Sequence, residues 1–144
     1  GWDFRCGYRG AYGMKEIRAF SRESGIVSEF PEPTLYEGER VSSSLIRKRI
    51  FEGDIRSAEA MLGRKYALDC SASVWKEDGC ALTAERSAFV QVVPERGTYG
   101  VRVIADGCAS EARFTAESHI LRLENLQKDV RHIQAVEFEK TIKE

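Results

Sequence analysis

Apolar positions near the start of the chain follow a helical period. This spacing, with a glycine after it as a stop signal, predicts a helix that carries Met14, Ile17 and Phe20 and ends before Gly25. Residues 1–13 are rich in glycine and aromatics and predict the end of a strand that runs into a loop. The apolar run at residues 25–30 predicts a second strand. The order strand, helix, strand is typical of an α/β unit with parallel strands.

Two further helices are predicted between residues 42 and 63. The first follows a run of serines and ends at Gly53. Asp54 is a suitable N-terminal cap for the second, and Gly63 ends it in turn. The apolar residues that define the two helices are Leu45, Ile46, Ile50 and Phe51 in the first and Ile55, Ala58, Met61 and Leu62 in the second.

The pattern changes after Tyr66, where a period of two replaces the helical period. Residues 68–74 alternate between apolar and polar and predict a half-buried strand. Such a strand-rich half predicts an all-β meander or a small barrel, so the fold class expected for the whole chain is α+β. The further strands are predicted at residues 89–93, 98–104, 112–123 and 130–138.

Composition limits the classes of function. With 144 residues, 42% of them hydrophobic, the chain suits one ordinary domain or two small ones. The net charge is −1 and basic residues do not cluster, so we expect no nucleic-acid partner. No apolar run approaches the roughly 20 residues of a membrane span, so we expect no membrane partner. The chain starts without methionine on an expected strand end, and we expect it to be a fragment or the ordered part of something longer.

Cysteine and histidine residues give no metal or redox motif. None of the four cysteines forms a C-x-x-C pair, and scattered cysteines without a signal peptide are typical of a reducing, cytoplasmic setting. His119 and His132 lack ligand spacing, so structural roles are expected. Trp2 and Trp75 suit packing better than stacking on a ligand ring. The oligomeric state is left open.

Three consecutive hydroxyls, at Ser42, Ser43 and Ser44, precede the predicted helix and lie between Arg40 and Arg47. Hydroxyls, cationic side chains and the free N–H groups of a helix start together suit a phosphate. The simpler alternative is that one of the first two serines caps the helix and the basic residues form a solvated face. Taken alone, the run favours this simpler alternative.

Three segments in register resemble the bacterial bifunctional riboflavin kinase/FMN adenylyltransferase (FAD synthetase) family. G-W-D-F-R-C-G at residues 1–7 resembles the family's G-x-D/N-F-x-F-G segment, with Cys6 in place of the usual aromatic. V-S-S-S-L-I-R at residues 41–47 resembles its I-S-S-T-x-I-R motif. The stretch from E-G-D to L-G-R-K-Y, at residues 52–66, resembles the E-G-D…L-L-G-R-P-Y stretch that joins the two catalytic modules.

The resemblance implies two domains. Residues 1–62 are expected to form the C-terminal half of an FMN adenylyltransferase-like α/β module of nucleotidyltransferase type, and residues 63–144 a shortened riboflavin-kinase-like β-barrel. The implied reactions are adenylyl transfer from ATP to FMN and phosphorylation of riboflavin, both with Mg²⁺. The His-bearing, Gly-rich phosphate loop of the family is absent from this sequence. The residues that the resemblance assigns are Ser42, Ser43, Ser44 and Arg47 to the nucleotide phosphates and Asp3, Phe4 and Arg40 to the flavin.

The second half of the chain resembles the kinase module less closely. E-S-H-I-L at residues 117–121 resembles the family's E-x-H-x-L strand, in which the glutamate, here Glu117, activates the riboflavin hydroxyl. C-A-L-T-A-E at residues 80–85 corresponds to the G-F-P-T-A-N motif that holds ATP and Mg²⁺. Thr83 survives in this motif and Glu85 replaces the asparagine, so either is an implied Mg²⁺ ligand. The changed motif predicts a degenerate kinase half.

Other interpretations stay open. The chain is alternatively a non-catalytic remnant that binds flavin or nucleotide or serves as a partner-binding scaffold. A third interpretation is an unrelated α/β domain whose matches arise by chance. For Glu117, a polar position in an alternating strand is the simpler explanation, and for Asp3 a turn residue at a strand end explains the sequence equally well.

Overall fold

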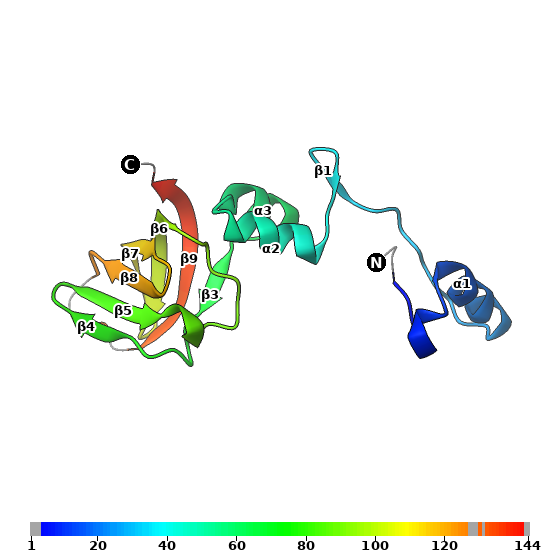
Figure 1. The fold of residues 1–144 in the computed structure, drawn as a ribbon, viewed down its shortest axis with the longest axis horizontal. Helices are drawn as coiled ribbons and strands as arrows, with labels where there is room; N and C mark the ends of the chain where they lie inside the picture. The colour runs from blue at the N-terminus through cyan, green and yellow to red at the C-terminus, as the bar shows by residue number, and fades with distance from the viewer. Residues whose placement is uncertain (1–3, 127–129, 131, 143–144) are drawn as a thin grey trace. The chain divides into compact units, whose positions relative to one another are not determined.

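The computed structural model describes residues 4–126, 130 and 132–142. The chain divides into two compact units, Gly1–Val41 and Ser42–Glu144, which we call unit 1 and unit 2 and describe separately. Figure 1 labels most of their helices and strands.

Unit 1 is built from a helix and a short hairpin. Its elements are η1 (Tyr8–Gly10), α1 (Met14–Glu23), β1 (Leu35–Tyr36) and β2 (Glu39–Arg40). The predicted helix is confirmed as α1. It begins where the Gly13 N–H donates a hydrogen bond to Glu16 Oε2 at 2.9 Å, which satisfies one of the N–H groups that a helix start leaves without an internal partner. That bond also lowers the pKa of Glu16.

The strand predicted at residues 25–30 is wrong, because this segment has no strand conformation. Ile26 and Val27 are 55% and 94% exposed, so the apolar run covers no core within unit 1. The strands described in this unit are the antiparallel pair β1 and β2. The parallel α/β arrangement is therefore not seen in residues 4–41.

Unit 2 begins with two helices, α2 (Ser43–Phe51) and α3 (Ile55–Leu62), that match the predicted ones. Ser42 Oγ accepts a hydrogen bond from the Leu45 N–H at 3.2 Å, and Asp54 Oδ1 accepts one from the Ser57 N–H at 3.2 Å. Both are N-terminal caps, each worth about 0.5–2 kcal/mol. Gly63 ends α3 in the left-handed conformation at φ 68°, as the sequence predicted.

The rest of unit 2 is a curled, antiparallel sheet of seven strands in the order β3-β9-β6-β7-β8-β5-β4 (Figure 1). The prediction of an α+β fold with a small barrel-like antiparallel sheet is confirmed at this level. A short 3₁₀ helix, η2 (Arg86–Ala88), follows β5. The strands are β3 (Ala67–Asp69), β4 (Lys76–Asp78), β5 (Ala81–Glu85), β6 (Gly97–Ala105), β7 (Cys108–Ala116), β8 (Ile120–Glu124) and β9 (Ile133–Ile142).

The core of unit 2 lies inside the curled sheet and under the helix pair. Tyr99, Phe114 and Phe138 are at most 1% exposed. The Phe138 ring packs edge-on against the other two at centroid distances of 5.2 and 5.3 Å, an arrangement that aromatic pairs favour. Ile50 of α2 and Ile55 of α3 join the same core. The helix pair therefore packs with the sheet, while the division into family modules at residue 62 stays a prediction.

The strand prediction was wrong in three stretches of unit 2. Within residues 112–123, a turn at residues 117–119 separates β7 from β8. Only the first residues of 68–74 belong to a strand, because Ser73 turns the chain and donates its hydroxyl to the Cys70 carbonyl at 2.7 Å. Residues 89–93 form a loop. The sequence pattern also missed β4 and β5. For β4 the reason is that it consists of three exposed charged residues and carries no apolar alternation.

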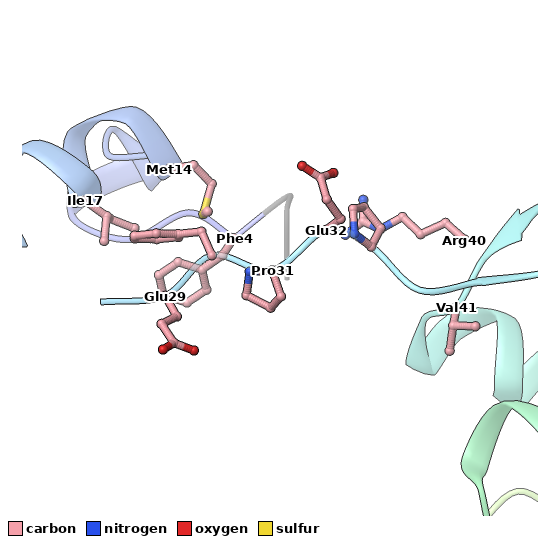
Figure 2. A pocket seen from close by; sticks show the side chains of 10 residues that line it. Phe4, Met14, Ile17, Glu29, Pro31, Glu32, Arg40 and Val41 are labelled. Carbon is pink, nitrogen blue, oxygen red and sulfur yellow. The ribbon is translucent and has the colours of Figure 1, made fainter. Parts of the chain in front are cut away.

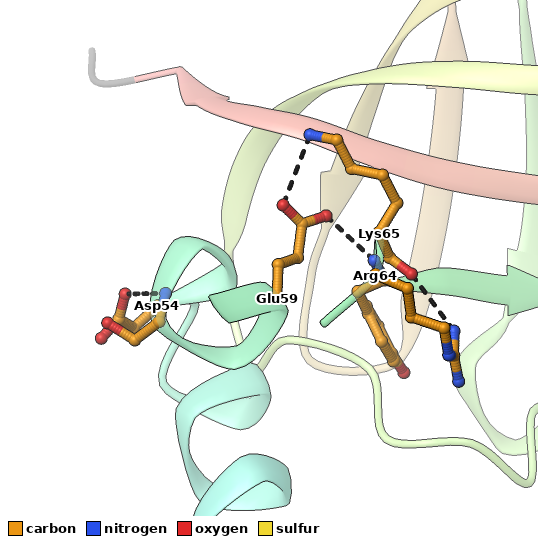
Figure 3. A network of polar contacts seen from close by, with 6 residues as sticks. Asp54, Glu59, Arg64 and Lys65 are labelled. Atoms are coloured by element: carbon orange, nitrogen blue, oxygen red, sulfur yellow. Dashed lines mark hydrogen bonds and ion pairs between the residues drawn. The ribbon is translucent and has the colours of Figure 1, made fainter. Parts of the chain in front are cut away.

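A polar network joins α3 to the start of β3 (Figure 3). Glu59 Oε1 accepts a hydrogen bond from the Tyr66 N–H at 2.9 Å, and Glu59 Oε2 lies 3.4 Å from Lys65 Nζ. The Tyr66 hydroxyl donates to the Val92 carbonyl. The network fixes the direction in which the chain leaves α3 and enters the sheet.

Candidate functional site

Two of the three residues assigned to the flavin line one cavity in unit 1. Phe4 and Arg40 border a cavity of about 410 Å³, whose other walls include Met14 and Ile17 of α1 (Figure 2). Asp3, the third assigned residue, lies outside the described residues. The structure thus brings together side chains that are 36 positions apart in the sequence.

The folding of unit 1 explains how these side chains meet. Met14 and Ile17 lie three residues apart on α1 and share one face of the helix. The Arg18 guanidinium lies 4.8 Å from the centre of the Phe30 ring, which ties residues 29–33 to α1. At the other end, the Val41 N–H donates to the Thr34 carbonyl at 2.9 Å beside the hairpin that carries Arg40.

The chemistry of this cavity combines apolar walls with one guanidinium. Phe4, Met14, Ile17 and Phe30 supply apolar surface, and Arg40 supplies the cationic group. Apolar and aromatic walls with a few polar groups are typical of sites for small ring-bearing ligands. An arginine adds planar, two-pronged recognition of a carboxylate or phosphate. Glu29 and Glu32 also border the cavity and add negative charge.

The serine run takes up two roles in the structure. Ser42 is the cap of α2, so its hydroxyl is already used as an acceptor. Ser43 and Ser44 lie exposed in the first turn of α2, and no acidic residue lies in that turn. Arg47 is exposed one turn further on. The capping interpretation is therefore confirmed for Ser42, while Ser43, Ser44 and Arg47 form an accessible polar helix start.

The residues assigned to the kinase half lie on β5 and in the turn between β7 and β8, and they border two cavities. Thr83 and Glu85 border a cavity of about 290 Å³ that Lys76 also lines. Glu117 borders a second cavity of about 450 Å³. Ile120 borders both cavities and pairs with Glu85 in the sheet.

Thr83 and Glu85 already make hydrogen bonds with other residues of the chain. The Thr83 hydroxyl donates to the Lys76 carbonyl at 3.4 Å, and Ser87 Oγ donates to Glu85 Oε2 at 3.4 Å. The Glu85 carboxylate remains exposed. Hydroxyl and carboxylate oxygens are suitable Mg²⁺ ligands, and the Lys76 side chain is suited to a phosphate. The side chains that line this cavity are therefore of the chemical types that bind Mg²⁺ and a phosphate.

Arg86 is a residue of the site that the sequence did not single out. It follows Glu85 directly and donates hydrogen bonds to the main-chain oxygen of Glu117 at 2.8 and 3.1 Å. Its partners are carbonyl groups, which every residue carries, so nothing in the sequence marks them. The one sequence signal that could have drawn attention to Arg86 is its charge at the position directly after β5.

The remaining sequence predictions concern metals and tryptophans. Among the described residues, no group of three or more His, Cys, Asp or Glu side chains is placed to hold a metal ion. His119 and His132 are both exposed. Trp75 packs edge-on against Phe89 at a centroid distance of 6.0 Å, while Trp2 lies outside the described residues.

Comparisons with known proteins give the fold and no family. No protein-family model matches the chain, and no curated protein matches it. Among solved structures, it is similar to a crystal structure described as a macrolide-efflux protein from Streptococcus pneumoniae, with a TM-score of 0.71 and 17% identity. The match covers 95% of this chain and 50% of that chain, so the present chain spans half the length of its structural neighbour.

A likeness at this identity concerns the fold alone. In the part of the chain that the structure describes, no helix combines the length and apolar character that crossing a membrane requires.

Proposed function

We propose that the chain is part of an enzyme of FAD biosynthesis that transfers the adenylyl group of ATP to FMN. One observation carries the proposal: Phe4 and Arg40, which the family resemblance assigns to the flavin, line the same apolar cavity of unit 1. In this proposal the ring system of FMN packs against Phe4, Met14 and Ile17, and the Arg40 guanidinium binds the FMN phosphate.

The proposed reaction forms one bond to phosphorus and breaks one. A phosphate oxygen of FMN attacks the α-phosphorus of ATP, and the bond from that phosphorus to the oxygen bridging to the β-phosphate breaks. Pyrophosphate leaves with the electron pair. Ser43, Ser44 and Arg47 are proposed to bind phosphate groups of ATP at the start of α2, where N–H groups and a cation favour negative charge. Mg²⁺ would reduce the charge on the triphosphate.

Turnover is the direct test of the proposal. The complete protein is incubated with FMN and Mg·ATP, and FAD and pyrophosphate are measured beside an active member of the family. Formation of FAD supports the proposal, and its absence under conditions in which the reference enzyme is active contradicts it.

Binding to the chain itself tests the two assigned sites separately. Arg40→Gln is expected to weaken FMN binding by about tenfold to a hundredfold, because a charged hydrogen bond contributes about 1.5–3 kcal/mol. It should leave riboflavin binding unchanged, since riboflavin has no phosphate. Arg22→Gln, which removes an exposed arginine from α1, is the matched control. Equal losses for FMN and riboflavin would contradict the assignment of Arg40.

The nucleotide assignment is tested in the same way. Arg47→Gln is expected to weaken ATP binding and to leave FMN binding unchanged. Arg56→Gln, an exposed arginine on α3, is the control. An equal loss of ATP affinity in both variants would contradict a specific role of Arg47 in ATP binding.

A second candidate function, a non-catalytic scaffold, is favoured by one observation in unit 2. The hydroxyl of Thr83, which this chain shares with the kinase motif, donates to the Lys76 carbonyl, and Glu85 adds negative charge beside it. We therefore propose that the sheet is a degenerate riboflavin kinase. Calorimetry with riboflavin, FMN, ADP and ATP distinguishes the candidates, because a pure scaffold binds none of them.

A further inference from the structure

Arg86 joins two segments that are distant in the sequence. Its Nη1 donates to the Val93 carbonyl at 3.1 Å, and its Nη2 donates to the carbonyls of Pro94 and Glu95 at 2.6 and 2.7 Å. Its Nε and Nη2 donate to the Glu117 carbonyl at 3.1 and 2.8 Å. One guanidinium thus holds residues 93–95 and the turn between β7 and β8.

The first of these segments, residues 93–96, is fixed from several sides. Pro94 is almost completely buried. The Glu95 N–H donates to the Phe51 carbonyl at the end of α2 at 2.8 Å, and the Tyr99 hydroxyl donates to the Arg96 carbonyl at 3.3 Å. Arg86 connects this fixed segment to the β7–β8 turn, and the Arg96 side chain makes a second link to the same turn.

The second segment carries Glu117. The Arg86 N–H donates to the His119 carbonyl at 2.9 Å, and the Glu117 N–H donates to the Ile120 carbonyl at 3.0 Å. Across the turn, Arg96 Nη2 donates to Ser118 Oγ at 2.8 Å. The backbone on both sides of Glu117 is therefore held in place.

The two segments together form one cavity. Arg96 from the first segment and Glu117, Ser118 and His119 from the second line the cavity of about 450 Å³. Only the arrangement of the segments relative to each other brings the carboxylate of Glu117 and the Arg96–Ser118 pair to the same space.

An arginine is the side chain that suits these partners. A guanidinium has five N–H donors in a planar fork, whereas a lysine ammonium has three donors at one point. The guanidinium donates its hydrogen bonds to main-chain oxygens. Burial lowers the pKa of Arg86, and the nearby Glu95 carboxylate opposes that effect.

We propose that Arg86 is a positioning residue that holds Glu117 and the Arg96–Ser118 pair around one ligand cavity. The identity of the ligand as the hydroxylated chain of a flavin rests on the proposed function, whereas the positioning does not. Arg86 acts through the backbone and does not itself line this cavity.

Hydrogen exchange on the full 144-residue chain tests the positioning. Arg86→Lys keeps the charge and Arg86→Gln removes it, while Arg102→Lys is the matched control, because Arg102 makes one contact to Glu137 at 4.0 Å on the sheet. Loss of these charged hydrogen bonds should speed exchange at the Glu95 and Glu117 amides by about tenfold or more.

The amides of the buried β6 strand serve as the internal reference. Val101 and Val103 should keep their wild-type exchange rates in both Arg86 variants. Unchanged rates at Glu95 and Glu117 would overturn the proposal. An equal increase throughout the sheet, or unfolding of both variants, would assign Arg86 to general stability and would also overturn it.

The two histidines provide a spectroscopic test that a general loss of stability would not reproduce. His119 lies in the turn held by Arg86, whereas His132 lies before β9, where its N–H donates to Asp106 Oδ2 at 3.5 Å. The imidazole NMR signals of His119 should shift in Arg86→Lys while those of His132 stay. Equal shifts at both histidines would contradict a local effect.

Riboflavin titration, followed by the imidazole signals of His119, which lines this cavity, completes the test. Arg86→Lys should weaken riboflavin binding about tenfold, the equivalent of 1.4 kcal/mol, relative to Arg102→Lys. If the wild-type chain binds no riboflavin, the flavin part of the proposed function fails for this unit, and the exchange result alone decides the positioning role. If riboflavin binds equally to both variants, Arg86 does not shape the ligand site.

Discussion

Units 1 and 2 differ most in what they bury. Phe114 and Phe138 of unit 2 are 0% exposed within a shared core, whereas Phe20 of unit 1 is 62% exposed. In residues 4–41 the one buried side chain is that of Ser21. Burial of apolar surface is the main favourable term in folding. The buried aromatic core of unit 2 therefore supplies most of the free energy that stabilises this unit. Unit 1 leaves several of its large apolar side chains exposed.

The largest expected effect comes from removing a core aromatic. Phe114→Ala should lower the free energy of unfolding of unit 2 by about 3–5 kcal/mol, because the cavity left behind adds to the lost burial. Phe20→Ala in unit 1 should change it by less than about 0.5 kcal/mol. Urea unfolding measures both, and similar losses in the two variants would break the contrast between the units.

Two glycines share the same backbone conformation. Comparing their alanine variants separates the cost of backbone strain from the cost of steric crowding. Gly53 in unit 2 and Gly38 in unit 1 have φ values of 79° and 82°. A β-carbon on Gly53 would lie 2.6 Å from Tyr99 Oη, whereas one on Gly38 would meet nothing within 4 Å.

Gly53→Ala should therefore cost about 2–4 kcal/mol, as the sum of left-handed strain and overpacking. Gly38→Ala should cost at most about 1–2 kcal/mol, from the left-handed strain alone, and this cost should affect only unit 1. Thermal unfolding followed by circular dichroism compares them. Equal shifts would show that Tyr99 yields to the added methyl group.

The interior of unit 2 should also respond to alkaline pH. Burial raises the pKa of the Cys70 thiol from about 9 to about 12. A folded pKa above the unfolded value means that the stability is fully present below about pH 9 and is lost as the pH rises towards 12. The loss from this thiol between about pH 9 and 11 should be about 2–3 kcal/mol.

Urea midpoints at a series of pH values measure this loss. Cys70→Ala should flatten the decline, and Cys108→Ala, which removes an exposed thiol, is the matched control. The pKa of Tyr66 is likewise raised by burial, to about 12, so Tyr66→Phe should remove a second part of the decline above pH 10. Identical pH profiles for wild type and Cys70→Ala would contradict the role of burial.

The smallest expected effect concerns the helix starts. Ser42→Ala removes the cap of α2 and should cost unit 2 about 1 kcal/mol. Glu16→Ala removes the equivalent bond at the start of α1 and should leave the unfolding of unit 2 unchanged. Ser44→Ala, which alters an exposed serine beside the cap, is the control for the serine run. A loss for Ser44→Ala as large as that for Ser42→Ala would reassign the cap.

The sequence predicted the helices well because their signals are local. The cap residues Ser42, Asp54 and Gly63 act on backbone groups within four positions, so the pattern contains the whole interaction. The strand predicted at residues 25–30 was wrong for the opposite reason. An apolar run forms a strand only where a partner strand pairs with it, and Ile26 and Val27 remain exposed.

For the candidate site, the sequence predicted which residues to consider, and their roles stay predictions. A family motif contains Phe4, the arginines beside the serine run include Arg40, and the structure places both residues on one cavity. The family motifs also picked out Glu85 and Glu117, which the pairing of Glu85 with Ile120 brings to one end of the sheet. Arg86 escaped detection because its partners are main-chain oxygens, and which carbonyls meet depends on how the sheet curls.

One side chain of the 89–93 loop has a consequence for how molecules of this protein behave in concentrated solution. Gln91 Oε1 accepts a hydrogen bond from the Asp69 N–H at 2.5 Å, and Gln91 Nε2 donates to the Ala67 carbonyl at 3.1 Å. Its amide thus takes the place of a neighbouring strand along β3, at the edge of the sheet. Unpaired strand edges are templates on which further chains add and aggregate. Gln91 therefore occupies backbone groups on which a further strand would pair at the β3 edge of the sheet.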